Sequence, residues 1–150
     1  MLKPLSDWDR RYLGLAQHVA QWSKDPSTKV GAVAVGETKN LLAAGFNGVP
    51  PGIADDARLE NREWKYEHVV HAELNALFNA TFPVHELFVT QPCCHRCAVH
   101  ILAKRTVKRI VAIYTPEFMS RWHKSVSATE NVFMEAGVEF LIYPKEEVLP

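Results

Sequence analysis

The sequence predicts an α/β fold in which helices cover a mixed sheet of about five strands. Short apolar runs alternate with amphipathic helical patterns, a turn-rich stretch joins the first two runs, and no segment repeats. The expected order is helix, strand, strand, helix, strand, helix, strand, helix, strand. A helix between two strands favours parallel pairing, whereas a tight turn favours antiparallel pairing. We therefore expect an antiparallel hairpin first and parallel pairing of the last two strands.

The first half of the chain is expected to hold one helix, a hairpin and a long loop. Apolar residues at helical spacing predict a helix from about Trp8 to Trp22, with Ser6 as its N-cap. Val30–Val35 and Leu41–Gly45 are apolar runs joined by the turn-like segment GETKN. Residues 46–66 carry NGVPPG and many charges, and they are expected to form the longest loop.

The second half alternates helices with strands. The expected strands are Leu87–Thr90, Lys108–Ile113 and Val138–Ile142. The expected helices are Val70–Ala80, one marked by Cys97 to Leu102 that ends near Arg105, and Ser125–Ala136. A loop that holds Pro116 precedes the last helix, and Gly137 is expected to stop it.

The composition is that of one ordinary globular domain spanning residues 1–150. Hydrophobic residues make up 47% of the chain and charged residues 23%. Because 17 Lys and Arg balance 17 Asp and Glu, the chain lacks the net charge that a nucleic-acid-coating protein uses. No apolar run approaches about 18 residues. The first residues, MLKPLSDWDRR, lack an apolar secretory core, so we expect no membrane partner and a cytoplasmic location, in the cell or in an infected host cell.

The residues that carry chemistry form two clusters, each where a helix is expected to begin. Cys93, Cys94 and Cys97 are the chain's three cysteines, a poor disulfide framework that favours metal binding or redox chemistry. Cys94 and Cys97 are spaced so that one helical turn presents both thiols to one ion. With His71 as a third ligand, one imidazole and two thiolates select zinc over magnesium or calcium. Three protein ligands leave the fourth position open, as in a catalytic zinc site.

Glu73, two residues after His71, completes a candidate reaction centre. Zinc lowers the pKa of a bound water, and a nearby carboxylate can carry the water's proton onward. Hydrolytic deamination of an amidine-like ring carbon needs this combination, because water adds, a ring nitrogen is protonated and ammonia leaves. His-x-Glu followed about twenty residues later by Cys-x-x-Cys is the pattern of zinc nucleobase deaminases.

Five stretches spread over nearly the whole chain match one known family in order. They are Ser23–Val35, Gly45–Gly52, Lys65–Leu77, Leu87–Ala98 and Glu135–Val138. In these stretches the chain resembles the deoxycytidylate (dCMP) deaminases. The resemblance implies a three-layer α/β/α cytidine deaminase-like fold, a zinc cofactor, and conversion of dCMP to dUMP and ammonia, which feeds thymidylate synthesis. The family usually has proline directly before its first ligand cysteine, whereas here Cys93 occupies that place and Pro92 precedes it.

The resemblance also implies a role for each matching residue. The residues implied for zinc and for the proton shuttle are His71, Cys94 and Cys97, with Glu73 as the shuttle. Asn47 would hydrogen-bond the sugar or base, the backbone N–H of Ala72 would meet the pyrimidine O2, and a carbonyl near Pro92 would accept from the amino group. Ser23 and Lys24 are assigned to the 5′-phosphate.

Regulation and assembly are further implications of the resemblance. Members of the family are typically activated by dCTP with Mg²⁺, inhibited by dTTP, and hexameric. The effector contacts are expected at the NG-x-P-x-G loop, represented by Gly48, and at the acidic pair Asp55 and Asp56, near subunit contacts. We therefore expect a homo-oligomer, with a hexamer favoured, that binds nucleotides and does not bind nucleic acid.

Structural roles remain open for several of these residues. A purely structural zinc site would need a fourth ligand, for which the candidates are His68, His95 and Cys93. Cys93 otherwise serves as a small buried filler, Asn47-Gly48 is also a common turn dipeptide, and residues 23–26 also suit a helix terminator. The acidic pair would then be a solvated loop. Alternative phosphate ligands and a stacking residue lie in the expected late loop, at Arg121, Lys124 and Trp122.

Two other functions compete with dCMP deamination. One is another zinc deaminase, acting on dCTP, a 5-modified dCMP, guanine, tRNA adenosine, or a pterin- or riboflavin-pathway substrate. Zero net charge without a basic stripe disfavours tRNA. The other is a non-catalytic zinc scaffold that binds nucleotides, which Glu73 disfavours because a scaffold has no use for that carboxylate.

Overall fold

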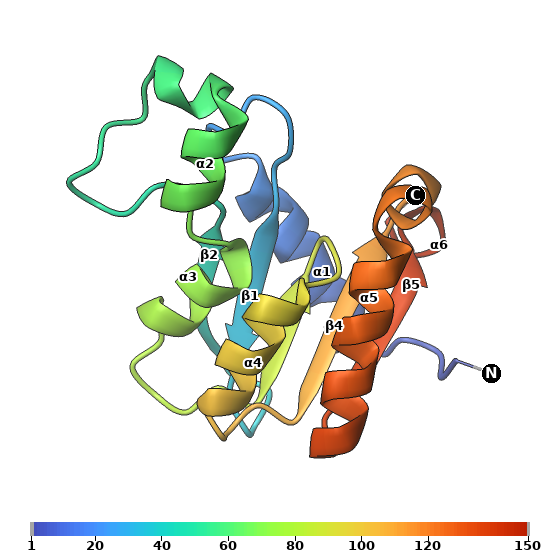
Figure 1. Cartoon of the computed structure of the whole chain (residues 1–150). Coiled ribbons are helices and arrows are strands. Elements are labelled where there is room, and N and C mark those ends of the chain that lie inside the picture. The colour runs from blue at the N-terminus through green and yellow to red at the C-terminus, as the bar shows by residue number, and fades with distance from the viewer. Residues whose placement is uncertain (1, 150) are drawn as a thin grey trace.

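A computed structural model describes residues 2–149, and these form three layers around a central sheet (Figure 1). The sheet has five strands in the order β2-β1-β3-β4-β5. The strands are β1 (Gly31–Val35), β2 (Leu41–Phe46), β3 (Glu86–Val89), β4 (Arg109–Tyr114) and β5 (Glu139–Pro144). The helices are α1 (Asp7–Ala20), η1 (Ala57–Glu60), α2 (Arg62–His68), α3 (Ala72–Asn79), α4 (His95–Ala103), α5 (Pro116–Ala136) and α6 (Lys145–Val148).

The pairing of the strands confirms the predicted mixed sheet. β1 pairs antiparallel with β2 and also with β3, whereas β3 with β4 and β4 with β5 are parallel pairs. Phe88 of β3 lies opposite Val33 on one side and Val111 on the other, and all three side chains are fully buried. The parallel pairing follows from the helices that connect these strands.

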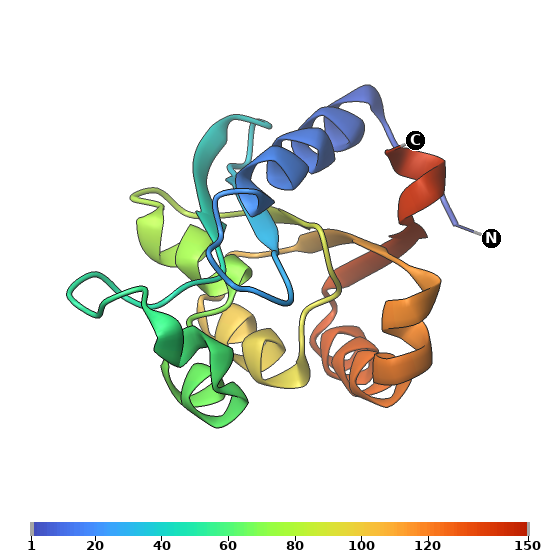
Figure 2. The same cartoon turned by 90° about the horizontal axis from the view of Figure 1, so that it is seen from above.

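Two apolar layers hold the helices on opposite faces of the sheet. α1 and α6 pack on one face with alternate strand residues such as Val33 and Phe88, and α3, α4 and α5 pack on the other with residues such as Leu87 and Ile110. The view from above shows this division, with the sheet between the two sets of helices (Figure 2). Each large buried side chain contributes about 1.5–3 kcal/mol relative to an exposed one, so these layers dominate stability.

Two stretches expected to be loops are in fact helical. The loop predicted around Pro116 is wrong, because α5 begins there: the Thr115 hydroxyl caps the Phe118 N–H at 3.2 Å, and proline suits the first helical position. Trp122 therefore lies on α5 and not in a loop. Gly137 ends α5 in a left-handed conformation with φ 74°, as predicted.

The predicted loop 46–66 is likewise shorter than expected. Residues 57–60 form η1, capped by Asp56, and α2 begins after Asn61, whose side chain accepts from the Trp64 N–H at 3.1 Å. These two caps were present in the sequence, but the charged composition around them favoured a loop. Other predicted boundaries differ by a few residues, and α6 was not expected. Among residues 2–149, no helix is long and apolar enough to cross a membrane.

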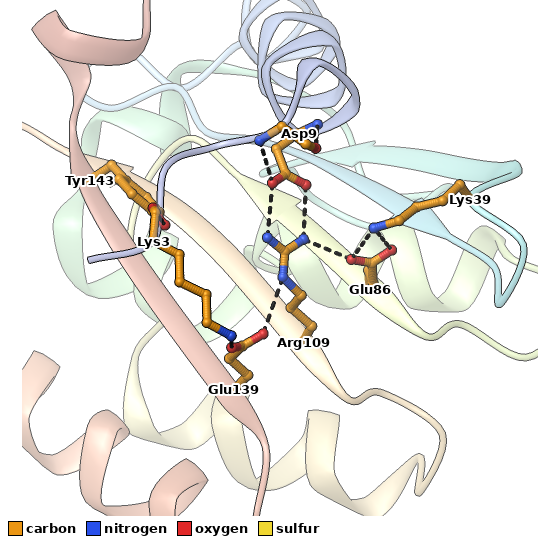
Figure 3. A network of polar contacts seen from close by, with 8 residues as sticks. Lys3, Asp9, Lys39, Glu86, Arg109, Glu139 and Tyr143 are labelled. Atoms are coloured by element: carbon orange, nitrogen blue, oxygen red, sulfur yellow. Dashed lines mark hydrogen bonds and ion pairs between the residues drawn. The ribbon is translucent and has the colours of Figure 1, made fainter. Parts of the chain in front are cut away.

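A network of ion pairs occupies the end of the sheet where β3, β4 and β5 begin (Figure 3). Arg109 pairs with both carboxylate oxygens of Asp9, at 2.8 and 2.9 Å, and with Glu86 at 2.8 Å. Its Nε lies 3.2 Å from Glu139, and Lys39 lies 2.7 Å from Glu86. The network ties α1 to the middle of the sheet.

Candidate active site

His71, Cys94 and Cys97 come together at the opposite end of the sheet, where β3 leads into α4. The Nδ1 atom of His71 lies 3.1 Å from Cys97 Sγ and 3.7 Å from Cys94 Sγ, and the three ligand atoms all lie within 4.8 Å of one another. A tetrahedral zinc ion with Zn–S and Zn–N bonds of about 2.3 and 2.0 Å separates its ligand atoms by roughly 3.5–3.8 Å. The donor set and its spacing therefore fit zinc.

Two helix N-termini position this group. His71 is the N-cap of α3 and makes no side-chain capping bond, so its imidazole remains directed at the two sulfur atoms. Cys94 is the N-cap of α4, and its Sγ accepts from the Cys97 N–H at 3.5 Å. The positive end of α4 therefore favours the thiolate form of Cys94.

The ionisation of the three residues is shared among them. The hydrogen bond from Cys97 lowers the pKa of Cys94 to about 3, and the same bond, with burial, raises the pKa of Cys97. The hydrogen bond to Cys94 raises the pKa of His71. Binding of a metal ion to a group of this kind would release protons from its ligands.

Glu73 lies beside this group in the first turn of α3. Its side chain is only 4% exposed, and its Oε1 lies 3.8 Å from His71 Nδ1. Burial raises the pKa of Glu73, although the neighbouring His71 opposes the shift. A carboxyl group with a raised pKa is suited to both accepting and donating a proton near neutral pH.

Asn47 and Ser23 support each other next to the start of β1. The amide of Asn47 accepts from the Val30 N–H at 2.8 Å and donates to the Thr28 carbonyl at 2.9 Å. The Ser23 hydroxyl donates to the Asn47 carbonyl at 2.8 Å and accepts from the Asp25 N–H at 3.2 Å. Both residues are buried, so each has a structural role in addition to any contact with a ligand.

A cavity of about 430 Å³ brings together four of the predicted substrate and effector residues. They are Lys24, Asn47, Gly48 and Asp55. Lys24 Nζ lies 3.5 Å from Asp55 Oδ2, and both side chains are exposed. Val69, two residues before His71, also lines the cavity and connects it to the metal group along the chain. Asp56 lies elsewhere, since it caps η1 and pairs with Arg58 at 2.8 Å.

The remaining predicted residues surround the metal group or lie away from the cavity. Ala72 is the first residue of α3, where N–H groups lack partners within the helix, and both Ala72 and Pro92 are buried. The residues lining the cavity do not include Arg121, Trp122 or Lys124.

Within residues 2–149, the group able to hold a metal includes none of the proposed fourth ligands, His68, His95 and Cys93. His68 stacks on Trp64 with ring centroids 4.2 Å apart, and burial raises the pKa of the Cys93 thiol. The Cys93 carbonyl accepts from the Thr129 hydroxyl at 2.9 Å. Sequence reasoning missed Thr129, whose signal is a polar residue in the buried stripe of α5.

Comparison with known proteins identifies the family. The family model for the cytidine and deoxycytidylate deaminase zinc-binding region matches residues 6–114. A protein of Aliivibrio fischeri described as an uncharacterized deaminase in the luxG 3′ region is 37% identical over 142 residues, which cover 93% of this chain and 96% of that protein. The deoxycytidylate deaminase of Mus musculus is 34% identical over 146 residues, which cover 89% of this chain and 78% of that protein.

Solved structures agree with this result. The apo form of the dCMP deaminase from cyanophage S-TIM5 superposes with a TM-score of 0.71 at 26% identity, covering 95% of this chain and 100% of that one. The form in complex with dCMP and dUMP gives a TM-score of 0.70 at 25% identity, with the same coverage. The fold is therefore cytidine deaminase-like, as the resemblance implied, and the protein is a hydrolytic enzyme. Since the zinc-binding region matches over residues 6–114, and relatives align along most of their own length, this chain belongs to the cytidine and deoxycytidylate deaminase family.

Proposed function

We propose that the protein hydrolyses dCMP to dUMP and ammonia. The observation that carries this proposal is the buried carboxyl of Glu73, 3.8 Å from His71, beside a group of one imidazole and two thiols that fits zinc. The substrate is supported by the relatives, because the mouse protein is a deoxycytidylate deaminase and the cyanophage enzyme is solved with dCMP and dUMP.

His71, Cys94 and Cys97 are the proposed zinc ligands. When bound, zinc supplies the Lewis acidity that makes a water molecule nucleophilic near neutral pH. The three residues would hold the ion through the imidazole of His71 and the two thiolates, and the start of α4 would stabilise the negative charge on Cys94.

Glu73 carries the protons of the reaction. Its carboxylate accepts a proton from the attacking water as oxygen bonds to C4 of the cytosine, and the proton passes to the ring N3. The remaining proton of the former water then reaches the amino group, the C4–N4 bond breaks, and ammonia leaves as the C4 carbonyl forms. One water is consumed and one ammonia released, and Glu73 ends as it began.

The substrate is held by groups around this centre. An amide nitrogen has two N–H groups, and the Asn47 amide donates one to Thr28, so we assign the second to the sugar or base. The Ala72 N–H, at the start of α3, meets the pyrimidine O2, and a carbonyl near Pro92 accepts from the amino group. Both assignments use polar backbone groups next to the metal ligands.

Lys24 is the proposed cation for the 5′-phosphate. Its exposed side chain borders the cavity beside Asn47, and its partner Asp55 is also exposed, so the pair can separate at little cost. Ser23 is assigned to the same phosphate site. Its hydroxyl donates to the Asn47 carbonyl and thereby orients the loop that carries Lys24.

Regulation and assembly are proposed for the same region. The loop from Gly48 to Asp55 borders the cavity, and Asp55, with Asp56 outside the lining but next to it in the chain, would hold Mg²⁺ accompanying dCTP, with dTTP as the opposing effector. Exposed apolar side chains rim this cavity, namely Trp22, Phe46 and Ile53, and an interface in a homo-oligomer, a hexamer by family resemblance, would cover them. A reducing cytoplasm would keep the thiols of Cys94 and Cys97 free to bind metal.

A turnover panel tests the proposed substrate. Purified protein is assayed for ammonia release from dCMP, dCTP, 5-methyl-dCMP and 5-hydroxymethyl-dCMP, each with dCTP plus Mg²⁺, with dTTP, or with neither as effector. We expect dCMP to have the highest kcat/KM, stimulation by dCTP and inhibition by dTTP. A higher kcat/KM for another substrate would replace dCMP, and ammonia release from none of them would contradict the proposed function.

A further inference from the structure

We propose that Asn75 is a positioning residue that sets the geometry of Asn47 relative to His71. Asn75 lies on α3, two residues after Glu73. The inference deepens the proposed function and rests on it, since it concerns how the substrate-binding and metal-binding groups are held together.

The Asn75 amide bonds two carbonyls from separate segments. Its Nδ2 donates to the Phe46 carbonyl at 2.7 Å and reaches the Val70 carbonyl at 3.3 Å. The Phe46 carbonyl and the Asn47 N–H belong to one planar peptide group, and the same holds for the Val70 carbonyl and the His71 N–H. One side chain therefore orients the peptide groups that lead into both site residues.

Backbone hydrogen bonds also join the segments around Phe46 and Val70, and Asn75 adds a contact that these bonds do not make. Gly48 and Val70 exchange hydrogen bonds of 3.1 and 2.9 Å, and the Asn47 N–H donates to the Val30 carbonyl at 3.2 Å. The Gly48–Val70 bonds hold the end of β2 to the segment before α3, and the Asn47–Val30 bond holds it to the segment before β1. The bond from Asn75 to Phe46 attaches the strand end to α3 itself, the helix that carries Glu73.

Gly45 allows α3 to lie directly on β2 at this point. A Cβ atom at Gly45 would lie 2.8 Å from the Ala72 carbonyl and closer still to the Ala76 N–H, so only glycine permits the contact. The short side chain of Asn75 reaches the Phe46 carbonyl because of this close approach. The close contact between α3 and β2 therefore fixes the position of Asn47 relative to His71.

Asn79 provides a matched control on the same helix. One turn after Asn75, its Nδ2 donates to the Ala44 carbonyl at 2.9 Å, two residues before Phe46 on the same strand. Both asparagines donate to backbone carbonyls of the edge strand β2, but Asn79 does so one turn farther from the metal group. Their variants lose the same kind of hydrogen bond and differ in its position.

The test compares Asn75→Ala and Asn75→Asp with Asn79→Ala and Asn79→Asp. For the Asn75 variants we expect the KM for dCMP and the Kd for dUMP to rise about tenfold, with a smaller fall in kcat. We also expect release of zinc to a chelator to be faster than in the wild type. The Asn79 variants should stay within about twofold of the wild type in all of these, even where thermal unfolding shows a comparable loss of stability.

Equal effects of the two positions on dUMP affinity and on zinc release would overturn the positioning role. The Asp variants keep the size of the side chain and remove the donor, so they decide the question if an Ala variant does not fold. If the wild-type protein does not convert dCMP, the proposed function fails. The comparison of zinc release, which needs no substrate, still tests the role of Asn75.

Discussion

The two ends of the central sheet both gather buried ionisable side chains, but these form a network of ion pairs at one end and surround a candidate metal-binding group at the other. Where β3 and β4 begin, Arg109, Lys3 and Lys39 face three carboxylates at 2.7–3.2 Å. At the opposite end, Glu73 is as buried as Asp9, and its neighbour is the imidazole of His71 at 3.8 Å.

This difference separates charged side chains that hold the fold together from the buried carboxyl of Glu73, which we propose takes part in the reaction. A buried carboxylate with a bidentate guanidinium partner stays ionised and contributes rigidity. A buried carboxyl without such a partner has a raised pKa and costs stability. The presence of such a carboxyl, Glu73, beside a group that can bind metal indicates a chemical role. The comparison predicts that variants at one end change activity and variants at the other change stability.

Replacing Glu73 should give the largest effect on activity. Glu73→Gln keeps the shape of the side chain but cannot shuttle a proton, so we expect kcat to fall about 10²–10⁴-fold. Zinc content should remain that of the wild type because Glu73 is not a proposed ligand, and resistance to urea should be equal or higher because a buried charge is gone. Measured turnover within about twofold of the wild type would exclude the proton-shuttle role.

Replacing Arg109 should lower stability and leave activity unchanged. Arg109→Met leaves Asp9 and Glu86 buried with less compensation, and we expect about 3–5 kcal/mol loss in the free energy of unfolding, measured with urea. The kcat of the folded fraction should not change, because the network lies at the far end of the sheet.

A double variant sharpens this prediction. Asp9→Asn combined with Arg109→Met should cost less than the sum of the two single variants, because the second change removes the charge that the first left unpaired. Additive losses would show that the bidentate pair is not a coupled unit, and the contrast between the two ends would then lose its physical basis.

Local patterns carried most of what the sequence predicted. His71, Cys94 and Cys97 were predictable because Cys-x-x-Cys at a helix start and His-x-Glu at another have short-range geometric consequences. The strands were predictable from continuous apolar runs, since the central strands β1, β3 and β4 are buried on both faces of the sheet, whereas the edge strands β2 and β5 are partly exposed.

Interactions between distant segments were not predictable in this way. Arg109 and Asp9 are 100 residues apart, and their pairing depends on the placement of α1 against the starts of β3 and β4. The bonds of Asn75 and Thr129 likewise depend on how helices lie on strands and loops. The early start of α5 is not predictable from Pro116 alone, because proline is common in loops and is also favoured in the first turn of a helix.

The smallest expected effect concerns the pH dependence of stability at the ion-paired end. Burial raises the pKa of Asp9, but hydrogen bonds from Arg109 and Ser6 outweigh it and hold that pKa below its usual 3.8. A carboxyl group with a lowered pKa in the folded state stabilises the protein above its unfolded pKa, and this contribution is lost as the pH falls through the folded pKa. The difference in free energy of unfolding between the wild type and Asp9→Asn should therefore become smaller as the pH falls below about 4.

Urea unfolding of the two proteins at pH 7 and at successive values down to about pH 3 measures this difference in the free energy of unfolding. Asp7→Asn serves as the control, because Asp7 is an exposed carboxylate in the first turn of the same helix and lies outside the network. A gap between wild type and Asp9→Asn that stays constant over this range would contradict the prediction. It would mean that Asp9 stabilises α1 mainly through its capping bond with Ser6, which an asparagine can partly replace, and not through its charge on Arg109.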